Sequence, residues 1–138
     1  VVLNKVLCID DDGVTLMICK MMLSKSSFAK EVVLAENGQI ALNLLENQSS
    51  IPELILLDIN MPRMNGLEFL DALRSDPELT HAVVFVLTTS KSDEDIMAAY
   101  REHVAGYLLK QRMDSDFMQV ISLLDHYWRI IELPVAEK

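Results

Sequence analysis

The chain is poor in the residue groupings that soft metal centres and disulfide frameworks require. It has only two cysteines, Cys8 in an apolar run and Cys19 in a helical stretch, and their spacing matches no metal site. We expect both to be reduced thiols in the core. The three histidines, His81, His103 and His126, stand apart in the sequence, which favours surface positions. A metal centre built on cysteine or histidine is therefore not expected.

Positive charge and long apolar runs are also scarce. Lys and Arg total 12 against 21 Asp and Glu, which gives a net charge of −9, and the basic residues do not cluster. Because such a surface repels phosphate, a nucleic-acid partner is not expected. No apolar run approaches the roughly 18 residues that a membrane span needs, and no signal peptide opens the chain. We expect a soluble, cytoplasmic protein without a membrane partner.

A chain of 138 residues suits one domain with a substantial core. We predict a single domain over residues 1–138, with a core from about residue 4 to 131 and a short tail at 132–138. The chain leaves no room for a DNA-binding domain. The polar residues after Leu133-Pro134 are interpreted as a natural terminus, and a fragment of a longer protein is the alternative.

Apolar runs without alternation predict strands that are buried on both faces, as in a parallel sheet. Asn37 and two capping-box patterns, Asn65-to-Glu68 and Ser92-to-Asp95, predict helix starts between the strands. The resulting alternation predicts a doubly wound α/β fold with right-handed crossovers and helices on both faces. The expected strands are Lys5–Ile9, Glu31–Ala35, Leu54–Leu57, Val83–Leu87 and Gly106–Leu109, and the expected helices cover about 14–25, 38–46, 66–75, 93–102 and 115–131.

The helices carry expectations about which faces are buried. The methionines of the first helix are expected to fill the core. In the second and third helices the inward residues are expected to be Ile40, Ala41, Leu44 and Leu45, and Leu67, Leu70 and Leu73. The last helix has two apolar stripes, wider than one core contact requires, so its extra face is expected to bind a partner or a second copy of the chain. The stripes are Phe117, Ile121, Leu124, Trp128 and Ile131, and Val120, Leu123, Tyr127 and Ile130.

Polar side chains follow the predicted strands where each strand ends. Asp10 and Asp11 follow the first, Asp58 follows four aliphatic residues of the third, Thr88 the fourth and Lys110 the fifth. The carboxyl ends of parallel strands meet at one edge, so these groups would share a pocket. Carboxylate oxygens suit Mg²⁺, a hydroxyl and an ammonium suit phosphoryl oxygens, and a carboxylate can accept a phosphoryl group covalently. Individually, Asp58 could mark a turn, Thr88 a strand end and Lys110 a solvated lysine.

Together these segments resemble the receiver domain of two-component response regulators. The resemblance rests on Ile9-Asp10-Asp11-Asp12, Leu57-Asp58-Ile59-Asn60-Met61-Pro62 with Gly66, Leu87-Thr88-Thr89, and Tyr107 followed by Lys110. The stretch from Leu87 to Ile96, Gln111 and the tail from His126 to Pro134 look similar to stand-alone regulators that work with bacterial phytochromes. The resemblance implies a flavodoxin-like five-stranded parallel sheet in the order 2-1-3-4-5 with five helices.

The resemblance also implies a function in signal transduction. Asp58 would be the phosphoacceptor and would take a phosphoryl group from a phosphohistidine of a sensor histidine kinase or phosphotransfer protein. Asp11, Asp58 and the backbone carbonyl of Asn60 would hold Mg²⁺, with Asp10 acting directly or through water. Lys110 would offset charge on the phosphoryl oxygens. Such a protein is no enzyme, but assists its own phosphorylation and dephosphorylation.

The output implied by the resemblance is a switch of a protein-binding surface. Thr88 would bond the new phosphoryl group and draw its loop inward, and Tyr107 would follow. The surface around the fourth helix, fifth strand and last helix would then bind a downstream protein target, with a homodimer through the last helix as a further possibility. The family usually has proline, often cis, where Gln111 stands. A cis bond before a non-proline residue costs about 3 kcal/mol, which favours a trans Lys110-Gln111 bond and a different aim for Lys110, and the conformation of the bond stays open at this point.

Two alternatives remain open at this point. Asp10-Asp11-Asp12-Gly13-Val14 also matches the start of haloacid-dehalogenase-type phosphatases, in which Asp10 would be the nucleophile and Asp12 the general acid. Against it, Asp58 would lack a role and no late Gly-Asp motif follows a strand. The other alternative is a receiver-like interaction module that signals without phosphate, for which Gln111 is the only support.

Overall fold

The computed structural model describes residues 3–47, 51–61, 64–112 and 118–130. Within these residues, five parallel strands form one sheet in the order β2-β1-β3-β4-β5, as predicted. The strands are β1 (Leu3–Ile9), β2 (Ala29–Ala35), β3 (Leu54–Leu57), β4 (Val84–Thr88) and β5 (Gly106–Leu109). β1 and β2 begin two residues earlier than predicted, and β4 is shifted by one residue so that it includes Thr88.

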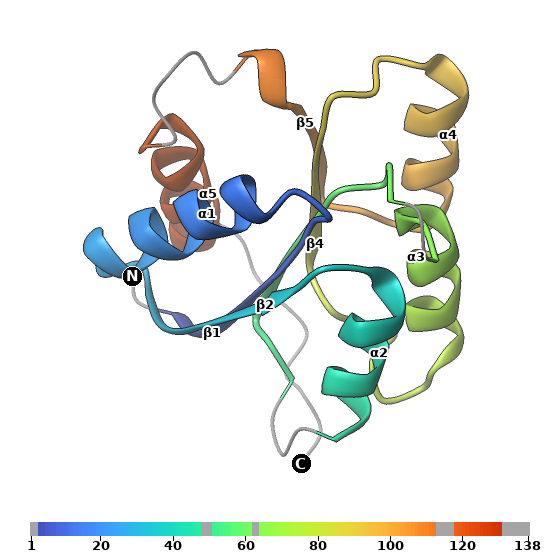
Figure 1. Ribbon diagram of the computed structural model, residues 1–138, viewed down its shortest axis with the longest axis horizontal. Helices are drawn as coiled ribbons and strands as arrows, with labels where there is room; N and C mark the ends of the chain where they lie inside the picture. Colours follow the sequence, from blue (N-terminus) through green and yellow to red (C-terminus); the bar gives the residue numbers. More distant parts are fainter. Residues whose placement is uncertain (1–2, 48–50, 62–63, 113–117, 131–138) are drawn as a thin grey trace.

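Helices cover both faces of this sheet (Figure 1). α1 (Gly13–Lys25) and α5 (Met118–Ile130) lie on one face, and α2 (Gly38–Glu46), α3 (Gly66–Ser75) and α4 (Asp93–Arg101) lie on the other. A 3-10 turn, η1 (Lys110–Arg112), follows β5. Every residue of the central strand β3 is buried, because helices pack on both of its faces. The core is therefore split by the sheet into two layers.

Side-chain caps fix the starts of the helices near the carboxyl ends of the strands. Asn65 accepts a hydrogen bond from the Glu68 amide, and Glu68 accepts one from the Asn65 amide, so the predicted capping box is confirmed. Asn37 caps α2 through the Ile40 amide. Ser92 caps α4, but the Asp95 carboxylate accepts a hydrogen bond from Ser90 instead of completing a box.

The predicted burial of the α1 methionines is wrong for two of them. Met17 is 70% exposed and Met21 58% exposed, whereas Met22 is partly buried against the core. Apolar residues occur on all sides of α1, so its pattern does not show which side faces the sheet. The residues that pack inward are Leu16, Cys19 and Leu23.

The other predicted helix faces are partly correct. In α2, Ala41 and Leu45 are buried as expected, but Ile40 is exposed and Leu42 takes its place in the core. In α3, Leu70 and Leu73 are buried, Leu67 only partly, and Phe69 is a core residue that the prediction missed.

The two stripes of α5 are not equivalent. Val120, Ile121 and Leu124 are buried, whereas Leu123 and Ile130 are exposed. Phe117 and Ile131 lie outside the described residues. Tyr127 stacks edge-on against Phe85 of β4 and against Trp128. The helix therefore packs through one face and keeps apolar side chains on its outer face.

The cysteines are buried and the histidines are exposed, as the sequence predicts. Cys8 and Cys19 are buried free thiols on β1 and α1. His81, His103 and His126 are all exposed. Among the described helices, none has the length and apolar character to cross a membrane.

Candidate functional site

The register of the sheet brings two carboxylates together. Ile9 of β1 pairs with Leu57 of β3, so the next residues, Asp10 and Asp58, leave adjacent strands at the same level. The Asp58 amide donates to the Ile9 carbonyl over 2.9 Å, which continues the pairing past the strand end. Both side chains are buried despite their charge. Such burial is costly unless the carboxylates are bonded to donors or a cation.

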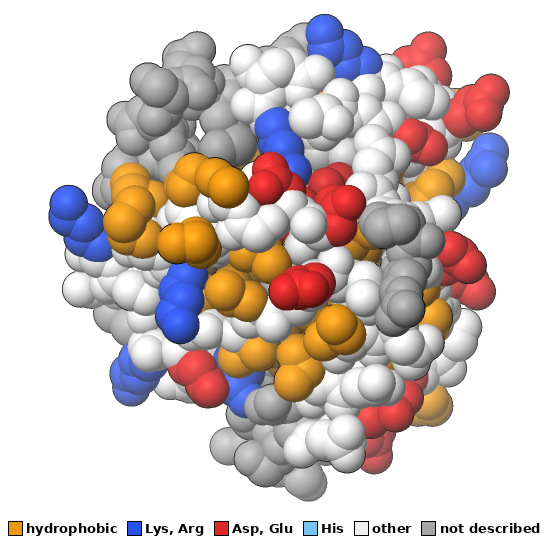
Figure 2. Space-filling view, in the orientation of Figure 1, with side chains coloured by type: hydrophobic (Ala, Val, Ile, Leu, Met, Phe, Trp, Pro, Cys, Tyr) orange, Lys and Arg blue, Asp and Glu red, His pale blue; other side chains and the backbone are white. Residues whose placement is uncertain are grey.

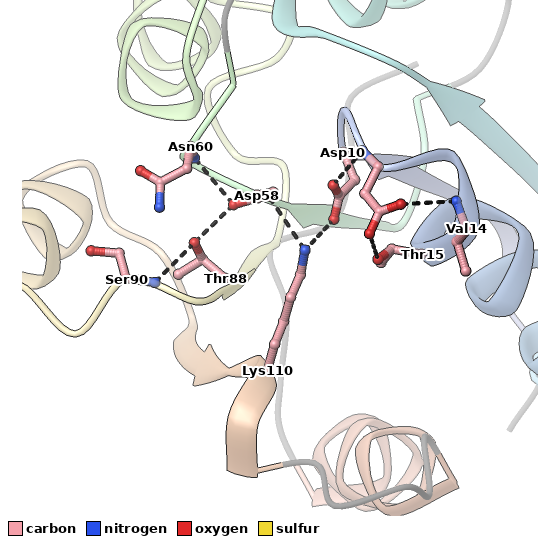
Figure 3. Close-up of polar contacts among 9 residues, drawn as sticks. Asp10, Val14, Thr15, Asp58, Asn60, Thr88, Ser90 and Lys110 are labelled. Atoms are coloured by element: carbon pink, nitrogen blue, oxygen red, sulfur yellow. Dashed lines mark hydrogen bonds and ion pairs between the residues drawn. The ribbon is translucent and has the colours of Figure 1, made fainter.

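Asp58 is held through both of its carboxylate oxygens (Figure 3). Its Oδ1 accepts hydrogen bonds from the Thr88 hydroxyl at 2.8 Å and from the Asn60 amide at 3.1 Å. Its Oδ2 lies 3.3 Å from the Lys110 ammonium. The residue is only 6% exposed. These contacts fix one orientation of the carboxylate at the edge of the sheet.

Lys110 reaches the same two carboxylates from the end of β5. Its Nζ lies 2.7 Å from Asp10 Oδ2, in addition to its contact with Asp58. Burial of the ammonium lowers the pKa of Lys110, but the hydrogen bonds and negative charges of Asp10 and Asp58 outweigh that effect, so the pKa is raised overall. The side chain is therefore a fixed positive charge inside the site.

Three carboxylates face this single ammonium. Asp10, Asp11 and Asp58 each offer an oxygen, and these oxygens lie within 4.8 Å of one another. Burial raises the pKa of Asp10, although its bonds from Lys110 and the Asp12 amide oppose the rise, and the charge of Asp58 adds to it. An all-oxygen donor set with excess negative charge fits a hard divalent cation. Asn60 follows at the same edge, beside Asp58.

Asp12 has a different task from its two neighbours. Its carboxylate accepts hydrogen bonds from the Val14 amide at 3.0 Å and from the Thr15 hydroxyl at 2.9 Å, and so caps α1. These bonds lower the pKa of Asp12. A general acid of the phosphatase type would have to hold a proton and aim at the pocket, so the geometry does not support that alternative.

Thr88 is linked to Tyr107 through Ser90. The Tyr107 hydroxyl donates to the Ser90 carbonyl at 2.9 Å, and the Ser90 amide contacts the Thr88 hydroxyl oxygen at 3.4 Å. The Ser90 hydroxyl in turn donates to Asp95 at the start of α4 over 2.6 Å. Burial raises the pKa of the Tyr107 hydroxyl. The loop after β4 is thus tied both to β5 and to α4.

Two contacts near the site were not predicted from the sequence. In the first contact, Asp95 accepts a hydrogen bond from Ser90, whereas the sequence predicts that Asp95 completes a capping box with Ser92. The Gln111 side-chain amide donates to the Thr89 carbonyl at 3.1 Å. The described residues contain no cis peptide, so the Lys110-Gln111 bond is trans. For the Gln111–Thr89 contact, the sequence gave only the presence of a side-chain amide at position 111, which did not identify Thr89 as its acceptor.

Comparisons with known proteins agree with this geometry. The sequence pattern of the family described as response regulator receiver domain matches residues 6–122. The response regulator Rcp1 of Synechocystis sp. is 31% identical over 137 residues, which cover 95% of this chain and 93% of the relative.

Solved structures of related regulators share the fold. The phosphorylated cyanobacterial phytochrome response regulator RcpA has a TM-score of 0.84 at 31% identity, with 96% of this chain and 99% of that chain covered. The Mn²⁺-bound form of Rcp1 has a TM-score of 0.80 at 29% identity, with the same coverage. Receiver domains bind a divalent metal, and the acidic cluster of this chain has the ligands for one. The chain therefore belongs to the receiver domain family of response regulators of two-component signalling.

Proposed function

We propose that Asp58 is the phosphoacceptor of a cytoplasmic, single-domain response regulator. The observation that carries the proposal is the Asp58 carboxylate itself, buried at a strand end and bonded by Thr88 and Lys110 through different oxygens. The Lys110 ammonium and the Thr88 hydroxyl lie beside this carboxylate, so both can bind the oxygens of an incoming phosphoryl group. The donor would be a phosphohistidine of a sensor histidine kinase or phosphotransfer protein.

The reaction is a displacement at phosphorus. A carboxylate oxygen of Asp58 forms the new O–P bond as the P–N bond of phosphohistidine breaks, and the electron pair of that bond stays on the imidazole. Lys110 offsets the charge on the transferring oxygens, and the Thr88 hydroxyl hydrogen-bonds the bound phosphoryl group. Asp10, Asp11, Asp58 and the Asn60 carbonyl would hold Mg²⁺, which supplies further charge neutralisation when bound. Hydrolysis of the resulting acyl phosphate resets the switch.

The surface of α1 suits a protein donor. Val14, Met17, Ile18 and Met21 are exposed on this helix, which begins directly after the acidic cluster. Figure 2 shows hydrophobic side chains gathered beside acidic ones on this face. Exposed apolar patches of this kind commonly mark protein contacts. A donor seated on α1 would bring its phosphohistidine to the pocket, so α1 is the proposed docking face.

The opposite side of the pocket suits the output. The phosphoryl group would compete with the Asp58 carboxylate for the Thr88 hydroxyl. A movement of Thr88 would then be transmitted to Tyr107 and α4 through the hydrogen bonds of Ser90. Met97 and Tyr100 of α4 are exposed, and so are Leu123 and Ile130 of α5. The proposed output is binding of a downstream protein, or of a second copy of the chain through α5.

Phosphorylation with a small donor tests the proposal. We expect incubation with acetyl phosphate and Mg²⁺ to add one phosphoryl group, and peptide mass spectrometry to place it on Asp58. Asp58→Asn should abolish the addition. Asp71→Asn, which alters an exposed carboxylate on α3 away from the site, is the matched control and should leave it unchanged.

A third variant separates the receiver function from the phosphatase alternative. Asp10→Asn should slow the addition but keep the label on Asp58, because Asp10 contributes charge and a metal ligand. Loss of the covalent phosphate only in Asp10→Asn, with Asp58→Asn still labelled, would overturn the proposal in favour of an Asp10 nucleophile.

A further inference from the structure

The side chain of Gln111 bridges two loops at the rim of the site. Its Nε2 donates to the backbone carbonyl of Thr89 over 3.1 Å. The two residues are 22 positions apart in the sequence; Gln111 belongs to the 3-10 turn η1 after β5, and Thr89 belongs to the loop after β4. A side chain thus extends the pairing of these strands beyond their last backbone partners.

The Gln111–Thr89 hydrogen bond joins the neighbours of Thr88 and Lys110, the two residues that bond the Asp58 carboxylate. Thr88 pairs with Leu109 in the sheet, so Thr89 and Lys110 occupy the next level at the strand ends. Thr88 bonds Oδ1 of Asp58, and Lys110 bonds Oδ2. Gln111 adjoins Lys110, and its acceptor adjoins Thr88. The distance between the hydroxyl and the ammonium across the pocket therefore depends on a contact that joins their neighbours.

On this basis we propose that Gln111 is a positioning residue for phosphoryl transfer, which holds Lys110 and Thr88 in mutual register through the Thr89 carbonyl. The proposal rests on the proposed function of Asp58. Gln111 touches neither Asp58 nor the metal ligands in the contacts of the described residues. It acts by limiting the freedom of the loops that carry the contacting groups, which keeps them aligned when charge develops on the phosphoryl oxygens.

The size of the effect follows from the exposure of the bridge. Gln111 and Thr89 are both exposed, so water can replace the lost donor and the fold should not depend on it. A single hydrogen bond of this kind corresponds to a rate effect of about three- to tenfold if its whole contribution is expressed in the transition state. The prediction is thus a moderate loss of rate without a loss of stability.

Replacement of the amide by a thioether of similar length tests the bridge. Gln111→Met removes the donor, and Gln39→Met makes the same change at an exposed amide of α2, whose contact among the described residues is with Asn43 of the same helix. The full chain is incubated with acetyl phosphate, and the rate of phosphoryl addition at Asp58 is followed by mass spectrometry over a range of Mg²⁺ concentrations. Amide hydrogen exchange is measured in the segment Thr88–Lys91.

We expect Gln111→Met to lower the rate at saturating Mg²⁺ about three- to tenfold. The Mg²⁺ concentration for half-maximal rate should stay the same, because the carboxylate ligands lie on other strands. Exchange in Thr88–Lys91 should become faster, whereas Gln39→Met should match the wild type in every measurement. A general structural defect would instead shift the melting temperature and the Mg²⁺ dependence together.

Two results would overturn the proposal, and neither coincides with failure of the proposed function. A wild-type rate in Gln111→Met, with the wild type labelled at Asp58, leaves the receiver function intact and removes the positioning role. Unchanged amide hydrogen exchange in Thr88–Lys91 of Gln111→Met would show that the Gln111–Thr89 contact does not restrain this loop, even if no variant accepts phosphate. Absence of labelling in the wild type, or labelling that survives Asp58→Asn, refutes the proposed function instead.

Discussion

Two glycines at helix starts near the site differ in the space around them. A Cβ on Gly66 would clash with the Ile59 Cα and would lie 2.7 Å from the Asp58 carbonyl oxygen, both backbone atoms. A Cβ on Gly13 would meet nothing within 4 Å. Neither glycine has a positive φ. Close approach of α3 to the strand end, and not backbone conformation, thus requires glycine at position 66.

Alanine at these two positions should therefore have opposite effects. Gly66→Ala must push α3 away from Asp58, so we expect it to lower the free energy of unfolding by about 1–3 kcal/mol. Gly13→Ala should raise it by roughly 0.4–1 kcal/mol, since the alanine restricts only the unfolded chain. Urea unfolding followed by circular dichroism measures both. Equal changes in the two variants would contradict the steric explanation.

Arg74 connects α3 to the loops beside it. Its guanidinium donates to four backbone carbonyls, those of Thr80 and Ala82 before β4 and those of Glu102 and His103 after α4. Burial lowers the pKa of Arg74, but guanidinium is so basic that it keeps its charge. One side chain therefore satisfies acceptors in two connections that have no regular structure.

Removal of this side chain should loosen both connections. We expect Arg74→Met to lower the free energy of unfolding by about 2–3 kcal/mol, because the carbonyls lose a charged donor and water reaches only some of them. Arg101→Met, at an exposed position of α4, is the matched control and should change little. Denaturant titration of both variants provides the comparison. A similar loss in the two proteins would show that the carbonyl contacts contribute nothing specific.

Helices were predictable from sequence where local signals and packing agree. α3 has a capping box, a clear apolar face and a buried side that matches most of its pattern. α1 has apolar residues all round, so nothing in its sequence distinguished the sheet-facing Leu16 from the exposed Met17. That choice depends on where the sheet and α5 lie, which is a property of the assembled domain.

The site was predictable to the same extent. Asp10, Asp58 and Lys110 follow strands and Thr88 ends one, and the order of a parallel sheet is enough to bring strand ends together. The contacts of Ser90 with Asp95 and of Gln111 with Thr89 join the loop after β4 to α4 and to η1, and they depend on side-chain conformations that no spacing encodes. Sequence thus identified the groups at the centre of the pocket and missed those that support it.

From the charge of the whole molecule we expect its stability to depend on cations. The net charge is −9, and three carboxylates converge on one edge of the sheet. Burial raises the pKa of Asp10 above its usual 3.8, whereas the unfolded chain keeps the ordinary value. Between these two values the folded protein binds more protons than the unfolded chain does. The contribution of Asp10 to stability in the metal-free protein therefore falls as pH rises through that interval.

Mg²⁺ should reverse this loss, since a bound cation favours the charged carboxylate. A ligand at 100 times its dissociation constant stabilises a folded protein by about 2.7 kcal/mol. We expect the increase in melting temperature caused by Mg²⁺ to be smaller at low pH, where Asp10 is protonated, and to grow as pH rises through the raised pKa of Asp10. Thermal melts with and without Mg²⁺ across this range measure the effect.

Matched carboxylate variants locate the cation. Asp11→Asn removes one of the three clustered ligands and should abolish most of the Mg²⁺-dependent increase in melting temperature. Asp71→Asn on α3 reduces the net negative charge by the same amount and should keep that increase. If both variants lost the increase equally, the stabilisation would arise from general screening of the negative charge. If neither lost it, the cation would bind elsewhere. Only an unequal response ties the stability of the domain to the pocket that holds Asp58.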